Sequence, residues 1–303
     1  MAEVVALILN FRHPESTLAV VADLVHSGCA DVGVVVLDNS GGSAELRTAL
    51  EGRPGHELIA FERNLGYCAA MNRGIARARE LGARFVLFLN DDVRLPPQFL
   101  RPLRDALAND ASLAAVGPTI VTPNGRAWSQ GGEVRARPNL VTLRNQGGEP
   151  APLESGPEAV GFLPGACALY RLADLAALGD LDEEYFMYWE DVDLGARLHA
   201  RERGVVWLPW IRVTHAASSS SGGGRSPLRK YMSAVNTVRW LRAHGRARDW
   251  LAFFVFEIAL FPLTFLSGTS PRAAWAKLVG TLAGLRGARV TAGDVERWLP
   301  KRG

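Results

Sequence analysis

Cysteine is scarce in this chain of 303 residues, which contains only Cys29, Cys68 and Cys167. Their odd number and wide spacing exclude a disulfide framework and provide no zinc motif, which is typical of a protein from a reducing compartment. The amino terminus lacks a basic region, and its apolar run extends only from Val4 to Leu9. We therefore expect no secretory signal there and interpret this run as a first β-strand.

Long apolar runs are missing as well. The most apolar stretch, Trp250–Leu266, has 17 residues, is interrupted by Glu257 and Pro262, and is followed by the cations Arg272 and Lys277. As a helix it would span about 25 Å, which is shorter than the roughly 30 Å hydrocarbon core of a membrane. We therefore expect a helix that packs in a core or lies at a membrane interface, not one that spans a bilayer.

Charge is unevenly distributed, although the net charge is only +3. Residues 1–221 contain 20 Arg, no Lys and 27 acidic residues, whereas residues 222–303 contain 14 basic and 4 acidic residues. We expect the first part to be the catalytic domain and the second to be a helical, basic and apolar appendage. Because the basic residues alternate with apolar and Trp-rich stretches, this appendage favours an anionic membrane surface over nucleic acid, with ordinary solvated helix faces as the alternative.

Short β-branched runs alternate with amphipathic segments in the first part of the chain. Buried strands are expected at 4–9, 32–37, 58–61 and 85–89, and helices at about 14–27, 43–50 and 67–81. Alternation of this kind predicts an α/β fold built on a doubly wound, mostly parallel sheet with right-handed crossovers.

The rest of the catalytic region is less regular. Residues 123–160 are rich in Gly, Pro and Asn and predict irregular hairpins that shape part of a pocket. Strands are expected at 162–169, 205–208 and 211–214, and a helix at 190–203. The low-complexity segment 216–224 is either a linker or a lid ordered by substrate, because it begins directly after His215.

Acidic residues follow the strand Phe85–Leu89 without a break, in the sequence Asn90-Asp91-Asp92. Open α/β sheets bind ligands at the carboxyl edge, where Asn10 and Asp38 are also expected to lie. Hard oxygen ligands in that place suit Mg²⁺ or Mn²⁺ and therefore a substrate that carries a diphosphate. Such residues also form ordinary turns and helix caps, but two adjacent carboxylates favour the metal.

Other candidate residues lie elsewhere in the chain. Asn64-Leu65-Gly66 precedes a helix and either presents backbone N–H groups to phosphate or forms a simple turn. The cluster Trp189–Asp193 begins a helix, where a carboxylate could act as a base or merely favour the helix dipole. Asp193 and Arg197 are spaced to pair on that helix. His215, at a strand end, is a competent ligand for an ion of the Mn²⁺ type.

Taken together, these pieces resemble the family 2 glycosyltransferases with a GT-A fold, most closely the bacterial rhamnosyltransferase-like and galactofuranosyltransferase-like branch. The matching residues occur in the order of the family over about residues 4–240: Leu9-Asn10-Phe11, Leu37-Asp38-Asn39-Ser40, Asn64-Leu65-Gly66, Asn72-Arg73-Gly74, Leu89-Asn90-Asp91-Asp92, Pro164-Gly165-Ala166, Phe186 to Leu194 with Arg197, and Val213-Thr214-His215. The metal motif of the family is often written acid-any-acid. Asn90 departs from it, which gives Asp91 more weight than usual.

The resemblance implies a nucleotide-diphosphate sugar donor, dTDP- or UDP-linked, and a divalent metal, Mn²⁺ or Mg²⁺, held through Asp92 and His215. It also implies Asp191 as the base of a single displacement that inverts the anomeric carbon. The donor-binding residues that it implies are Asn10, Asp38, Asn64, Gly66, Asn72, Asp91, Gly165, Trp189 and Glu190. With the basic tail, it suggests transfer of rhamnose or a related sugar to a polysaccharide or lipid-linked glycan at the cytoplasmic face of the membrane, with a homo-oligomer left open.

Two other functions are compatible with parts of the sequence. A nucleotidyltransferase also combines a metal with a nucleotide on an α/β sheet, but it normally has a Gly- and Arg-rich phosphate loop with a Lys after the first strand. The segment Asn10–His13 differs from that loop, and the first lysine of the chain is Lys230. A catalytically inactive, membrane-docked binding protein is the other alternative, and the presence of Asp92, Asp191 and His215 argues against it.

Overall fold

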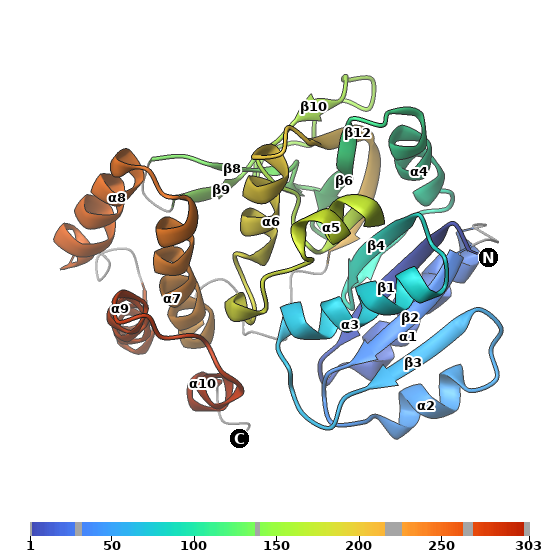
Figure 1. Ribbon diagram of the computed structural model, residues 1–303, viewed down its shortest axis with the longest axis horizontal. Helices are drawn as coiled ribbons and strands as arrows, with labels where there is room; N and C mark the ends of the chain where they lie inside the picture. The colour runs from blue at the N-terminus through green and yellow to red at the C-terminus, as the bar shows by residue number, and fades with distance from the viewer. Residues whose placement is uncertain (1, 28–31, 137–139, 216–225, 263–268, 300–303) are drawn as a thin grey trace.

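The computed structural model describes residues 2–27, 32–136, 140–215, 226–262 and 269–299. A central sheet with helices on both faces forms the body of the molecule, and the helices of the C-terminal region form a group beside it (Figure 1). The predicted boundary between residues 221 and 222, the low-complexity segment 216–224 and Cys29 lie outside the described residues.

Within the described residues, one sheet has ten strands in the order β10-β12-β6-β11-β4-β1-β2-β3, with β5 on β12 and β7 on β6. Its strands are β1 (Val4–Asn10), β2 (Val32–Asp38), β3 (His56–Ala60), β4 (Phe85–Asn90), β5 (Val93–Arg94), β6 (Leu113–Val121), β7 (Ala127–Ser129), β10 (Glu158–Ala159), β11 (Cys167–Arg171) and β12 (Gly204–His215). The strands β1 to β4 are parallel, as are β6 and β12, while β11 runs antiparallel between β4 and β6. The expected mostly parallel α/β sheet is confirmed.

Helices cover both faces of the sheet because successive strand residues point to opposite sides. In the first part of the chain they are α1 (Pro14–His26), α2 (Ala44–Leu50), α3 (Tyr67–Glu80), α4 (Leu100–Asn109), α5 (Leu172–Leu178) and α6 (Glu190–His199), with a 3-10 turn η1 (Glu183–Tyr185). From β1, Leu7 packs in a core with α3 and α6, whereas Ile8 packs in a second core with α1, α2 and α4. The first three helices and four strands therefore lie where the sequence predicts them.

Strand β12 differs from its prediction. The two strands expected at 205–208 and 211–214 are one continuous strand. Its pairing with β6 shifts register between Leu208 and Arg212. Pro209 lies within this shift, and because it has no backbone N–H it cannot contribute to a regular ladder. The proline therefore produces an irregularity within a strand and not the end of one.

Two further elements are shorter than expected. The strand predicted at 162–169 begins only at Cys167. The helix predicted at 190–203 ends at His199, and Glu202 then adopts a positive φ of 56°. A left-handed residue after a helix reverses the chain direction, and here it leads directly into β12.

The apolar stretch 250–266 does not form a single helix. Helix α8 (Ala247–Phe253) continues into a π-helix, η2 (Phe254–Ala259), and Pro262 follows, whose ring nitrogen cannot donate a helical hydrogen bond. Residues 263–266 lie outside the described part of the chain. Among the residues described, no helix is long and apolar enough to cross a membrane.

Helices α7 (Pro227–His244) and α9 (Pro271–Leu285) pack side by side, followed by α10 (Ala292–Trp298). Their backbones approach closely because α9 presents glycines to α7. A Cβ atom added at Gly280 would lie 2.5 Å from the carbonyl oxygen of Tyr231. One added at Gly284 would lie 2.9 Å from that of Val235. A larger residue at either position would push the two helices apart.

Candidate active site

The carboxyl ends of β1 and β2 are joined by polar side chains, as expected. Asn10 Nδ2 donates to Asp38 Oδ1 at 2.8 Å, and the same carboxylate accepts hydrogen bonds from Ser40 and from the Ser43 N–H. Burial raises the pKa of Asp38, but these hydrogen bonds outweigh it and lower the pKa below its ordinary value. Asp38 is fully buried, so its carboxylate stabilises the loop after β2.

The segment Asn64-Leu65-Gly66 is bound to its own surroundings. Asn64 Oδ1 accepts the Gly66 N–H at 2.9 Å, and the N–H groups of Tyr67 and Cys68 donate to the carbonyl oxygen of Phe186. Of the two alternatives left open by the sequence, the structure agrees with the simple turn, because these N–H groups are already bonded within the chain. A Cβ atom at Gly66 would lie 2.7 Å from the Phe186 ring, so the glycine permits the close approach of the second acidic segment.

Asn72 also connects α3 to that segment. Its side chain donates to the carbonyl oxygen of Leu181 at 2.9 Å and accepts the N–H of the same residue at 3.1 Å. Of the predicted donor-binding residues, five do not line the cavity described next: Asn10, Asp38, Asn64, Gly66 and Asn72. Their donor-binding roles stay predictions, and the hydrogen bonds that they make support the loops around the site.

A cavity of about 800 Å³ lies at the carboxyl edge of the sheet. Seven predicted site residues line it: Asp91, Asp92, Gly165, Trp189, Glu190, Asp191 and His215. The two acidic clusters and the histidine, far apart in sequence, therefore share one cavity. Its volume is within the range of roughly 300–1,000 Å³ that is common for small-molecule sites.

The Gly-rich region 123–160 contributes one wall of this cavity, as expected. Strands β8 (Gly132–Val134) and β9 (Val141–Leu143) form a separate antiparallel hairpin. Thr142 and Gln146 are among the residues of region 123–160 that line the cavity. Trp128, which the sequence analysis did not single out, also lines it, and its ring centroid lies 4.6 Å from that of His215.

Asp92 and His215 form the candidate metal-binding pair. The last residue of β12, His215, pairs with Val93, and this register brings His215 Nε2 to 2.9 Å from an Asp92 carboxylate oxygen. His215 is 3% exposed, and its Nδ1 atom has no hydrogen-bond partner among the described residues. Asp91 is buried beside them, and burial, followed by the charge of Asp92, raises the pKa of Asp91 to about 7.

These donors fit a divalent cation that a substrate helps to coordinate. Among the described residues, no group of three or more His, Cys, Asp or Glu side chains is placed to hold a metal. Mg²⁺ sites commonly use only one or two carboxylates together with substrate phosphates and water. One carboxylate, one imidazole and an open cavity therefore suit a metal bound together with a diphosphate.

The second acidic cluster follows a strained backbone segment. Phe186, Tyr188 and Trp189 all have positive φ values, of 58°, 70° and 74°. Residues other than glycine rarely adopt this region, at a cost of order 1–3 kcal/mol each, and such strain is typical of functional sites. Helix α6 starts immediately after this segment, with Glu190 and Asp191 in its first turn.

The C-terminal region holds this segment in place. Asn236 of α7, fully buried, donates through Nδ2 to the carbonyl oxygens of Tyr185, Met187 and Tyr188 at 2.8–2.9 Å. Asn236 was not expected from the sequence, because a single asparagine within a long helix gives no signal of a distant partner.

A second link between the C-terminal region and α6 involves Asp193. His244 Nε2 lies 2.7 Å from Asp193 Oδ1, and Arg197 donates to Asp193 Oδ2 at 2.6 Å. The expected pair of Asp193 with Arg197 is confirmed.

Glu190 and Asp191 have different electrostatic surroundings. Burial, and then the charge of Asp191, raises the pKa of Glu190, whose Oε2 atom is buried without a hydrogen-bond partner among the described residues. Burial also raises the pKa of Asp191, but the N–H groups of Val192 and Gly165 and the guanidinium of Arg229 oppose the rise. Glu190 therefore has the greater tendency of the two to hold a proton, because the hydrogen bonds and the cation that oppose the rise act on Asp191.

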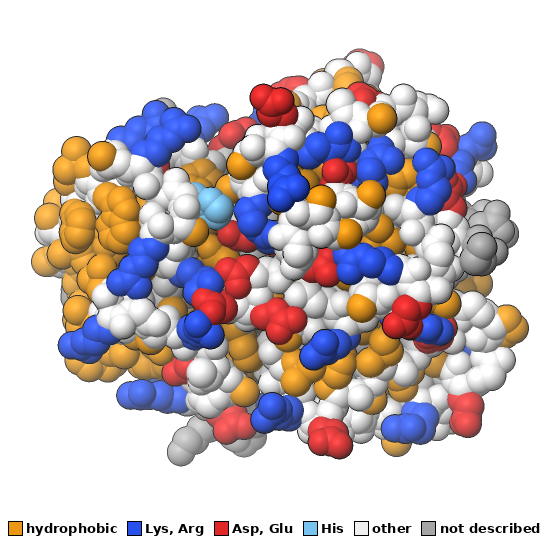
Figure 2. Space-filling view, in the orientation of Figure 1, with side chains coloured by type: hydrophobic (Ala, Val, Ile, Leu, Met, Phe, Trp, Pro, Cys, Tyr) orange, Lys and Arg blue, Asp and Glu red, His pale blue; other side chains and the backbone are white. Residues whose placement is uncertain are grey.

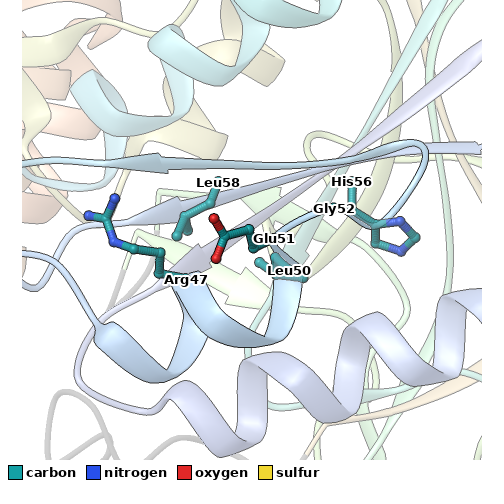
Figure 3. A pocket seen from close by; sticks show the side chains of 6 residues that line it. All are labelled: Arg47, Leu50, Glu51, Gly52, His56 and Leu58. Atoms are coloured by element: carbon teal, nitrogen blue, oxygen red, sulfur yellow. The ribbon is translucent and has the colours of Figure 1, made fainter.

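A smaller cavity of about 310 Å³ lies between α2 and β3 (Figure 3). It is lined by Arg47, Leu50, Glu51, Gly52, His56 and Leu58. Figure 3 shows Arg47 of α2 at one end of this cavity, Glu51, which follows α2, in the middle, and His56 at the far end. None of its residues belongs to either acidic cluster, so the larger cavity is the candidate active site.

Sequence comparisons identify the family of this chain. A profile described as Glycosyl transferase family 2 matches residues 7–179. The N-acetylglucosaminyl-diphospho-decaprenol L-rhamnosyltransferase of Mycobacterium tuberculosis is 31% identical over 245 residues, which cover 72% of this chain and 76% of that protein. The galactofuranosyltransferase GlfT1 of the same species is 26% identical over 200 residues, 64% of each chain.

Two solved glycosyltransferase structures share the fold. GalNAc-T7 with UDP, GalNAc and Mn²⁺ superposes with a TM-score of 0.60 at 14% identity, over 87% of this chain and 58% of that one. The mannosyltransferase PcManGT from Pyrobaculum calidifontis, in complex with GDP-Man and Mn²⁺, gives 0.58 at 15% identity, over 97% and 78%. These likenesses concern the fold alone. The resemblance inferred from the motifs is confirmed by the profile and the relatives, and the chain belongs to glycosyltransferase family 2, with a GT-A type fold.

Proposed function

We propose that this glycosyltransferase moves rhamnose or a related sugar from a dTDP- or UDP-linked donor to a lipid-linked or polysaccharide acceptor, with inversion at the anomeric carbon. One observation carries the proposal: Asp92, His215 and Asp191 line the same cavity. The relative that acts as a rhamnosyltransferase, named for a decaprenol-diphosphate acceptor, supports the choice of sugar and acceptor class.

Asp191 acts as the base in this proposal. Its carboxylate takes the proton of the acceptor hydroxyl while the acceptor oxygen bonds to the anomeric carbon and the bond to the donor diphosphate breaks. The N–H groups of Val192 and Gly165 hold the carboxylate in position. Protonated Glu190 beside it avoids a second charge and can donate a hydrogen bond to a sugar hydroxyl.

Asp92 and His215 would hold Mn²⁺ or Mg²⁺, and that ion, when bound, would stabilise the negative charge of the leaving diphosphate. His215 is the last residue of β12 and Asp92 directly precedes β5, so the pairing of these two strands brings the imidazole and the carboxylate to the cavity together. Trp189 lines the same cavity and offers an aromatic face for a sugar ring.

The proposal also assigns the two predicted regions different tasks, with residues 1–221 catalytic and residues 222–303 docked on the anionic inner face of the cell membrane. Hydrophobic side chains gather over α8 and α9, with Lys and Arg side chains along their border (Figure 2). Leu251, Phe254 and Trp275 are 65%, 48% and 59% exposed. An exposed apolar patch with cations around it suits a negatively charged lipid surface.

Transfer from a panel of nucleotide sugars to a synthetic N-acetylglucosaminyl diphospho-polyprenol, with and without Mn²⁺, tests the proposal. The wild-type chain should form product with at least one dTDP- or UDP-linked sugar, and chelation of the metal should stop it. Asp191→Asn should lower kcat by about 10²–10⁴-fold, the usual contribution of a general base, and leave the donor Kd nearly unchanged. Retained turnover in that variant would remove Asp191 as the base. Donor binding without transfer to any acceptor would instead favour the inactive binding protein.

A further inference from the structure

The C-terminal helices give one wall of the active-site cavity a positive charge. Arg229 and Lys230 of α7 and Lys277 of α9 line it, together with Glu257 of the π-helix η2. This wall is distinct from the Asp92–His215 pair, which belongs to the sheet. The proposed roles of the catalytic residues leave these cations without a function.

Lys277 and Glu257 form an ion pair inside the cavity. Lys277 Nζ lies 2.5 Å from Glu257 Oε2, and the two side chains are 17% and 15% exposed. Removal of two charges from water is costly, so a half-buried pair of this kind gives little net stability. Such a pair has a clear use if an anion can take the place of the carboxylate on the lysine.

Arg229 connects this wall to the catalytic base. Its guanidinium lies over the Tyr188 ring at 5.0 Å, and its charge opposes the rise that burial causes in the pKa of Asp191. Within the described residues, Arg229 makes no ion pair with a carboxylate. Asp191, Arg229 and Lys277 line one cavity, so an acceptor sugar bound at Asp191 shares that cavity with both cations.

The π-helix η2, which contains Glu257, also has an exposed apolar surface. Phe254, Val255 and Ile258 of η2 are 48%, 38% and 40% exposed, while Glu257 of that helix lines the cavity. π-Helical turns are rare and occur frequently at functional sites. Because Glu257 lines the cavity and the three apolar side chains are exposed, η2 has a charged side toward the cavity and an apolar side toward the exterior.

We propose that Arg229 and Lys277 bind the diphosphate of a lipid-linked sugar acceptor, that Glu257 occupies Lys277 until the acceptor arrives, and that the apolar side of η2 receives the lipid chain. This inference rests on the proposed glycosyl transfer and adds the acceptor subsite to it. The ligand is an amphiphile with a diphosphate between a sugar and a long hydrocarbon chain. The same phosphate chemistry could come from the donor, so the test must separate the two.

Two substitutions that break the same ion pair give opposite predictions. Lys277→Met removes the cation and should raise the KM for N-acetylglucosaminyl diphospho-polyprenol about tenfold or more, as expected for a lost hydrogen bond to a charged group. Glu257→Gln removes the competing carboxylate and should lower that KM. If the pair is only structural, both variants should shift KM in the same direction. Lys277→Arg retains the charge and should retain the affinity.

Three controls make the result specific. Arg272→Met removes an exposed cation from the same helix and should leave the KM for the acceptor unchanged, which separates this subsite from general attraction to lipid. A neutral alkyl glycoside acceptor should show no penalty from Lys277→Met. The KM for the donor should change less than about twofold in either Lys277→Met or Glu257→Gln, well below the effect of a lost charged contact.

The same measurements distinguish failure of the acceptor subsite from failure of the proposed glycosyl transfer. If the wild-type chain transfers sugar but Lys277→Met and Glu257→Gln leave the acceptor KM unchanged, the subsite is refuted and the glycosyl transfer stands. A rise in donor KM with Lys277→Met would assign the cation to the donor diphosphate and also refute it. Absence of transfer by the wild-type chain to any acceptor would refute the proposed function itself. Melting temperatures measured in parallel identify a variant that fails to fold. If Lys277→Met fails to fold, the acceptor KM of Lys277→Arg is compared with that of Glu257→Gln instead.

Discussion

Replacement of Asn236 by leucine should separate stability from catalysis. The amide of this buried residue donates to three carbonyl oxygens of the segment that precedes α6. Its two hydrogens can satisfy two of these bonds fully, and each carbonyl oxygen left unsatisfied costs about 1–3 kcal/mol, so we expect a loss of roughly 2–6 kcal/mol in the free energy of unfolding. A domain in the middle of the usual range of about 5–15 kcal/mol retains a positive stability after such a loss.

Catalysis should suffer more than folding. Without Asn236, the strain at Phe186, Tyr188 and Trp189 is no longer balanced by these hydrogen bonds, and the segment can relax. Asp191 lies two residues after Trp189, so relaxation would move the base. A displacement of about 1 Å in a catalytic group can cost on the order of 10²-fold in rate. We therefore expect kcat to fall by about 10²-fold in Asn236→Leu, with the donor Kd little changed.

The assay compares kcat at saturating substrates with the free energy of unfolding, and it requires a matched control. Val238→Ala removes two methyl groups from a fully buried residue of the same helix and should cost about 2 kcal/mol without touching the strained segment. That variant should retain kcat within about twofold when assayed below its melting temperature, because the carbonyl oxygens keep their donor. If Asn236→Leu loses similar stability and still keeps kcat, the carbonyl contacts do not position Asp191.

Two further predictions concern charge. Burial raises the folded-state pKa of Glu190 above its unfolded value, so the contribution of this side chain to stability is present at low pH and is lost as pH rises through the raised pKa. Glu190→Gln should therefore raise the melting temperature more at pH 9 than at pH 5. An equal shift at both pH values would contradict the burial argument. The double variant Leu251→Asp/Phe254→Asp should bind anionic vesicles much more weakly in a sedimentation assay while retaining transfer to a soluble short-chain acceptor, whereas unchanged vesicle binding would remove α8 and η2 as the docking surface.

Local patterns in the sequence predicted much of the fold. The strand Phe85–Leu89 is apolar throughout because it is buried on both faces. The first polar residue after such a run marks the end of the strand, so the sequence predicted that Asp91 and Asp92 lie at the edge of the sheet. The cavity that joins them to Asp191 and His215 agrees with the ordered motifs. Boundaries were less predictable, because the end of α6 and the continuity of β12 depend on single residues, Glu202 and Pro209, whose effect is set by their neighbours in space.

Contacts between distant segments account for what the sequence did not indicate. For the start of α3 the sequence left a phosphate site and a simple turn open, and it did not indicate that the N–H groups of Tyr67 and Cys68 bond to Phe186, which lies more than a hundred residues later. Asn236 and the cavity-facing side of Lys277 likewise depend on how α7 and α9 meet the catalytic region. A periodicity analysis marks which face of a helix is apolar, but it gives no information about which carbonyl oxygen a single buried amide will reach.

The contacts of α7 with the segment before α6 have a practical consequence for protein engineering. A hybrid enzyme that exchanged only the part of the chain after residue 226 would bring in an α7 from another parent, and the partners of Asn236 and His244 would then belong to a different sequence. Recombination is better placed before Asp182, so that η1, α6 and the C-terminal helices are inherited together. A crossover there keeps Asn236 and His244 with their partners, although it still crosses the main-chain bonds of Tyr67 and Cys68 with Phe186. Libraries of acceptor variants built in this way should contain a larger share of active members than those built from the later exchange.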